Sequence, residues 1–112
     1  MPNKYDDQNI FAKILRGEIP SKKVYEDDMM LAFHDAFPTA PVHVLVIPKG
    51  EYVNFADFVN NAPSELKEHF FIKITEIAES LKLEKGYRIL ANTGSSAGQT
   101  VFHFHMHIMG GW

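Results

Sequence analysis

The sequence contains no cysteine, no long apolar segment and no excess of charge of one sign. Without cysteine, the chain has no disulfide framework, no thiol nucleophile and no cysteine-based zinc site. No apolar run approaches the ~20 residues that a membrane-spanning helix needs. The polar residues 1–7 also lack the apolar segment of a signal peptide. We therefore predict a cytoplasmic protein with no membrane partner.

The charge balance also restricts the partners of the chain. Eleven Lys and Arg residues stand against 14 Asp and Glu residues, which gives a net charge of −3. The basic residues form no cluster, so the sequence predicts no nucleic-acid binding. A chain of 112 residues that is 46% hydrophobic fits a single compact domain, and we expect that domain to span residues 1–112.

The spacing of apolar residues predicts about five strands and two helices. Helices are expected at residues 8–16 and 65–83, and strands at residues 22–26, 29–35, 42–47, 87–93 and 101–109. Residues 49–61 fit either a loop or a short helix. Short connections between neighbouring strands favour an antiparallel sheet, so the predicted class is α+β.

Histidine is the unusual component of this sequence. Three of its six histidines, His103, His105 and His107, alternate with apolar residues within the segment 101–109. Because side chains alternate between the two faces of a strand, this pattern predicts three imidazoles on one face. The apolar face explains why the strand joins a sheet, but packing does not explain the histidine face.

Three readings of the histidine face compete: a solvated polar face, a metal site, and an anion-handling or catalytic site. Residues i and i+4 of a strand lie roughly 13 Å apart, so His103 and His107 would not easily share one ion. A neutral imidazole can attack an electrophile while a neighbouring ring holds or delivers a proton. The catalytic reading is favoured, with the central His105 as nucleophile.

The loop before the histidines indicates the kind of electrophile. Residues 94–100 are small or hydroxyl-bearing, apart from Gln99, and such a loop can present backbone N–H groups to an anion. Phosphoryl or nucleotidyl transfer is therefore the leading chemistry.

Residues 103–109, His-Phe-His-Met-His-Ile-Met, resemble the signature of the histidine triad (HIT) family. Segments 9–20, 31–35, 41–49 and 98–101 are also similar to segments of that family, in the same order and at its spacing. The resemblance covers nearly the whole chain and is greatest to the histidine triad nucleotide-binding (HINT-type) branch.

The resemblance implies a homodimer that hydrolyses purine nucleoside phosphoramidates to a nucleoside monophosphate and an amine. It makes His105 the nucleophile that forms a nucleotidyl-histidine, supported by His43, His103 and His107. The implied substrate contacts are Asp35 for the ribose, Phe11, Ile14, Phe33 and Ala36 for the purine, Asn92, Gly98, Gln99 and Thr100 for the phosphate, and Met106. No metal or other cofactor is required, and zinc is expected only as an adventitious ligand.

Other functions remain open at this stage. They are a dinucleoside polyphosphate hydrolase, a nucleotide-binding or scaffolding module with vestigial activity, and a zinc-binding domain. Ile72 falls on the polar face of the helix predicted at residues 65–83. It is either an ordinary surface residue or part of a partner surface.

Overall fold

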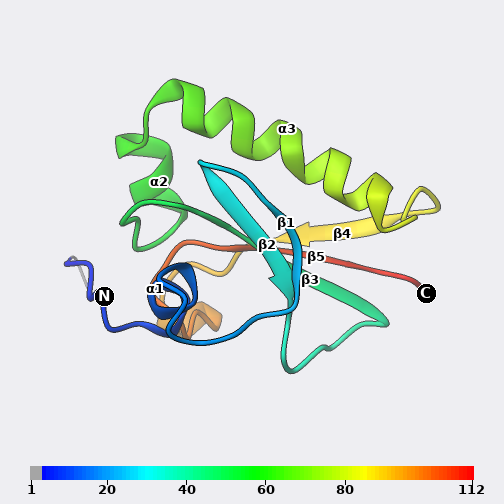
Figure 1. Cartoon of the computed structure of the whole chain (residues 1–112), viewed down its shortest axis with the longest axis horizontal. Helices are drawn as coiled ribbons and strands as arrows, with labels where there is room; N and C mark the ends of the chain where they lie inside the picture. Colours follow the sequence, from blue (N-terminus) through cyan, green and yellow to red (C-terminus); the bar gives the residue numbers. More distant parts are fainter. Residues whose placement is uncertain (1–3) are drawn as a thin grey trace.

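The computed structural model of the chain describes residues 4–112, which form one antiparallel sheet with helices on both faces (Figure 1). The elements are α1 (Ile10–Leu15), β1 (Lys23–Glu26), β2 (Met30–His34), β3 (Val42–Pro48), α2 (Phe55–Asn61), α3 (Ser64–Ser80), β4 (Tyr87–Leu90), a 3-10 turn (Ser95–Ala97) and β5 (Met106–Gly110). The strand order is β1-β2-β3-β5-β4, which confirms the α+β class. Within the described residues, α2 occupies the segment that the sequence left open, so there are three α-helices instead of two.

The sheet is buried on both faces, as the continuous hydrophobicity of β3 predicts. Val44 and Val46 face α2 and α3, where Phe58, Phe70 and Phe104 form the aromatic centre of the larger core. Residues of the opposite parity join a second core with α1, whose members are Phe11, Ile14, Leu31, Phe33, Leu45 and Ile47. The face that carries α1 is the one that also carries the functional site.

Local sequence signals explain where the helices begin. The side chain of Asn9 accepts a hydrogen bond from the Ala12 N–H, and Asn54 accepts one from the Asp57 N–H, so each caps a helix. The predicted apolar stripe of α3 is buried against the sheet, whereas Ile72 is 52% exposed. No helix within residues 4–112 is long and apolar enough to cross a membrane.

The predicted strand at residues 101–109 is wrong at its start, because regular pairing begins only at Met106. The partner strand β3 ends at Pro48, which has no N–H with which to extend the ladder. The Phe104 N–H instead donates to the Tyr52 carbonyl over 2.7 Å. Residues 101–105 therefore leave the sheet, and His103 and His105 lie outside regular structure.

Candidate active site

A cleft of about 1120 Å³ lies between α1 and the sheet face that α1 covers. The predicted site residues that line it are Phe11, Ile14, Phe33, Asp35, Ala36, His43, Thr100, His105 and His107. Its walls are largely hydrocarbon and aromatic, and its polar groups converge at one end. This combination is typical of sites that enclose a flat organic ring and orient a reactive group.

Three imidazoles form a row at the polar end of the cleft. The ring centroids of His105 and His107 are 5.2 Å apart, and those of His107 and His43 are 5.1 Å apart. Phe11 packs edge-on against His105, with its centroid 4.9 Å away. Asp35 lies at the far end, its Oδ2 atom 3.4 Å from His43 Nε2. The row brings together side chains from β3, β5 and the loops beside them.

The row does not contain His103, which corrects the prediction of three histidines on one open face. His103 is fully buried and does not line the cleft. Its Nε2 atom lies 2.9 Å from the Pro48 carbonyl, which accepts the hydrogen bond. The irregular path of residues 101–105 is the reason, because the strict alternation of a strand begins only at Met106.

The hydrogen bonds of His105 determine which of its nitrogens is free. Its Nδ1 atom lies 2.7 Å from the His103 carbonyl, which can only accept, so Nδ1 carries the proton. In the neutral ring the Nε2 atom then carries an unshared electron pair. His105 therefore offers Nε2 as a nucleophile on the wall of the cleft.

The protons of the His43 and His107 rings also follow from their hydrogen-bond partners. The Thr39 N–H donates to His43 Nδ1 over 3.0 Å, so His43 is protonated at Nε2. His43 Nε2 donates to His107 Nδ1 over 2.8 Å, which leaves the proton of His107 on Nε2. That Nε2–H is buried and has no partner among the described residues. The series of hydrogen bonds from Thr39 through His43 to His107 therefore ends in an N–H donor without a partner, on the ring next to His105.

Burial favours the neutral forms of His103, His105 and His107. Desolvation lowers the pKa of His107 to about 4, and the nearby His105 and His43 rings lower it further in the same direction. Desolvation also lowers the pKa of His103 to about 4 and lowers the pKa of His105. At pH 7 His105 therefore keeps the electron pair on Nε2.

The predicted phosphate contacts lie in the loop that leads to Thr100, and most of them do not line the cleft. Gln99 is buried: its Oε1 accepts from the Gly94 N–H, and its Nε2 donates to the Val53 and Val101 carbonyls. Gln99 therefore fixes the shape of the loop. Asn92 packs beside Gly98, whose φ of +94° favours glycine.

Met106 faces the core under α2 and α3, on the opposite side of the sheet from the cleft. The sequence alone could have predicted this orientation, because successive side chains of a strand point to opposite faces and Met106 is the neighbour of His107. Thr39 was not predicted at the site: its backbone N–H lies 3.0 Å and its Oγ1 atom 3.4 Å from His43 Nδ1, and a single threonine in a loop gives no signal of these contacts.

One set of groups has the spacing of a metal site. Asp35, His43 and His107 each offer one ligand atom, and these atoms lie within 4.8 Å of one another. Two imidazoles and a carboxylate are suitable ligands for a divalent ion. In the apo arrangement, however, the His43 Nε2–H and the His107 Nδ1 electron pair are used by each other.

Comparison with known proteins identifies relatives over almost the whole chain. The HIT domain family model matches residues 16–112. A HIT-like protein of Rickettsia prowazekii is 49% identical over 108 residues, which cover 96% of this chain and 90% of that protein. A solved HIT family hydrolase of Clostridium thermocellum is 41% identical with a TM-score of 0.87, over 96% of this chain and 93% of that one. A histidine triad nucleotide-binding protein of Candida albicans is 34% identical with a TM-score of 0.81, over 90% of this chain and 73% of that one.

Proposed function

The chain belongs to the HIT domain family, and from this membership and the geometry of the cleft we propose that it hydrolyses purine nucleoside phosphoramidates through His105. The observation that carries the proposal is the protonation pattern of the imidazoles. His105 Nδ1 is held by the His103 carbonyl, so its Nε2 electron pair is available on the wall of the cleft. Two relatives, the HIT family hydrolase and the histidine triad nucleotide-binding protein, support the same class of function.

The first chemical step is transfer of the nucleotidyl group to the enzyme. His105 Nε2 forms a bond to the α-phosphorus, and the bond from phosphorus to the amine nitrogen breaks. The amine nitrogen takes up a proton from solvent as it leaves. The buried His107 Nε2–H, an unpaired donor on the neighbouring ring, is suited to donate a hydrogen bond to a phosphate oxygen and keeps its own proton throughout.

In the second step water attacks the phosphorus of the nucleotidyl-histidine. The bond between phosphorus and His105 breaks, the water releases one proton to solvent, and the nucleoside monophosphate leaves with the neutral imidazole restored. Backbone N–H and imidazole donors around the phosphate stabilise the negative charge that builds up in both steps. The chemistry of these steps requires no metal ion.

The apolar part of the cleft is suited to the nucleoside. Phe11 and Phe33 pack at right angles with centroids 5.5 Å apart, and Ile14 lies beside them in the same cluster. A flat purine fits such a wall. Asp35 lines the same cleft beside His43, and its carboxylate is suited to accept hydrogen bonds from both ribose hydroxyls.

The deciding experiment uses His105→Ala. We expect this variant to lose phosphoramidate turnover while it keeps its fold and its affinity for adenosine monophosphate, because the purine wall and Asp35 are untouched. Mass spectrometry of acid-quenched wild-type protein should detect one nucleotide bound to the chain, and the variant should carry none. Undiminished turnover by His105→Ala would refute the assignment of the nucleophile.

We also propose that the protein is a homodimer and that residues 1–112 form one HIT domain. In support of a dimer, β4 is an edge strand whose Tyr87 and Ile89 are exposed, and Trp112 is 69% exposed. An exposed edge strand with apolar side chains is prone to pair with another strand. A second copy of the chain would cover it.

A further inference from the structure

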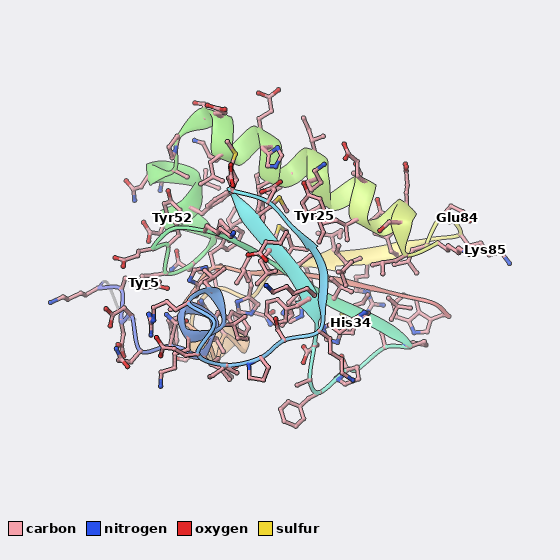
Figure 2. All side chains as sticks on the ribbon, in the orientation of Figure 1. Tyr5, Tyr25, His34, Tyr52, Glu84 and Lys85 are labelled. Atoms are coloured by element: carbon pink, nitrogen blue, oxygen red, sulfur yellow. The ribbon has the colours of Figure 1, made fainter. Side chains whose placement is uncertain are left out.

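Tyr5 contacts the signature histidine that lies outside the cleft. Its hydroxyl oxygen is 2.6 Å from His103 Nδ1, and the two rings meet edge to face with centroids 5.6 Å apart. Tyr5 precedes the segment that matches the HIT domain family, which begins at residue 16. Figure 2 shows Tyr5 beside α1, near the N-terminal end of the described chain.

The direction of this hydrogen bond follows from the other side of the His103 ring. The Pro48 carbonyl can only accept, so His103 Nε2 carries a proton. A neutral imidazole has one proton, and Nδ1 is therefore an acceptor. The Tyr5 hydroxyl donates to it, and burial raises the pKa of Tyr5, which keeps that hydroxyl protonated.

The backbone of His103 connects this contact to the nucleophile. The His103 carbonyl accepts the Nδ1 hydrogen bond that fixes the His105 ring. Residues 103–105 lie outside regular structure, so no ladder of strand hydrogen bonds fixes that carbonyl. Its orientation depends on the His103 side chain, which Tyr5 and Pro48 hold from two sides, and on the bond from the Phe104 N–H to Tyr52.

We propose that Tyr5 is a positioning residue for His105, acting through His103. The inference rests on the proposed function, because it takes His105 as the nucleophile. Without the Tyr5 hydroxyl, the Nδ1 atom of a fully buried ring has no donor. The ring then changes tautomer or turns, the His103 carbonyl shifts, and the His105 Nε2 electron pair loses its alignment with phosphorus. Tyr5 does not line the cleft, so we expect substrate binding to be preserved.

Tyr5→Phe tests the proposal, because it removes the hydroxyl and keeps the ring. We expect kcat for an adenosine phosphoramidate to fall about tenfold, which corresponds to about 1.4 kcal/mol, with KM unchanged. Tyr25→Phe is the matched control. The Tyr25 hydroxyl donates to Asp27 over 2.7 Å, and its ring lies under Lys73 of α3 (Figure 2). Tyr25 does not line the cleft, so loss of its hydroxyl should leave kcat unchanged.

A double mutant separates positioning from a general loss of stability. His103→Leu offers no acceptor to the Tyr5 hydroxyl, so Tyr5→Phe should cost nothing further in that background. A tenfold loss from Tyr5→Phe in both backgrounds would show that Tyr5 does not act through His103, and would overturn the proposal.

Imidazole ¹⁵N spectra give a readout that does not depend on turnover. In the wild type, His103 and His105 should show opposite tautomers, and Tyr5→Phe should shift the signals of both rings while Tyr25→Phe shifts neither. Unchanged imidazole signals, or an unchanged kcat, in Tyr5→Phe would overturn the positioning role. If the wild type does not turn over the phosphoramidate at all, the proposed function fails, and the spectra alone decide the role of Tyr5.

Discussion

At the scale of single residues, backbone groups set the protonation of the active-site histidines. The carbonyls of Pro48 and His103 select the tautomers of His103 and His105, and the Thr39 N–H selects that of His43. Side chains of neighbouring residues could have made these contacts, but backbone groups have no charge state of their own. The arrangement therefore stays the same over the whole pH range in which the rings are neutral.

The first prediction at this scale concerns acid. Because the pKa of His103 is lowered from 6.5 to about 4, the unfolded chain binds more protons than the folded one between these values. The contribution of His103 to the free energy of unfolding, roughly 3 kcal/mol, is therefore fully present above about pH 6.5. It decreases as the pH drops toward 4. Urea unfolding at a series of pH values measures it. His103→Gln should show a shallower decline, and an identical decline would contradict the assignment.

The second prediction concerns the ribose. Asp35→Asn keeps an acceptor for the Phe37 N–H but loses the charged acceptor proposed for the sugar hydroxyls. Affinity for adenosine monophosphate should fall by roughly tenfold, because hydrogen bonds to charged groups contribute about 1.5–3 kcal/mol. Calorimetry with the 2′,3′-dideoxy nucleotide is the control. An equal loss for both nucleotides would place the carboxylate elsewhere on the ligand.

At the scale of elements, Gln99 holds the loop of residues 94–100 to the rest of the fold. Its amide joins the Gly94 N–H at one end of the loop to the Val53 carbonyl, which lies just before α2. All of these groups are buried, so Gln99→Leu would leave them without partners. We expect a loss of about 3 kcal/mol in the free energy of unfolding. Thermal and urea unfolding test this, with the exposed Ser95→Ala as a control that should be neutral.

The element scale also shows how far the sequence could predict the site. Period-two and helical spacing located most of the strands and the long helix, because those patterns depend on burial of one face. The irregular path of residues 101–105 depends on Pro48 and Tyr52, about 50 residues away, and local alternation contains no trace of that pairing. His103 was for this reason expected on the same face as His105. Asp35, His43 and Phe11 were found through family resemblance, since their separate positions look like turn or core residues.

At the scale of the whole molecule, the sheet is open and ends in two edge strands, β1 and β4. The central strands are packed on both faces, but β4 has a free edge with Tyr87 and Ile89 exposed. We expect light scattering at micromolar concentration to give twice the 12.8 kDa mass of one chain. Ile89→Lys should reduce that mass to one chain. Ile72→Lys on α3 reports whether the helix joins the contact, and a monomeric wild type would refute the dimer.

The fold class and the pairing of β1 with β2 were predictable, because short connections between strands leave few topologies open. The position of β5 between β3 and β4 was not, since nothing in its own sequence distinguishes a central strand from an edge strand. The second core under α1 was also not evident. Its helix has only six residues, and its apolar positions read equally well as a wall for a ligand.

The donor that Thr39 offers to His43 is an amide hydrogen, and this has a consequence for how the site can be dissected. Mutagenesis with the standard amino acids changes only the side chain, so every substitution at position 39 except proline retains that amide hydrogen. A mutational scan at position 39 would consequently report only what the side chain contributes, through the Oγ1 atom that lies 3.4 Å from His43 Nδ1. Chemical ligation with an α-hydroxy acid at position 39 replaces the amide by an ester, and that single-atom exchange is the direct way to measure what the main chain contributes to the reaction.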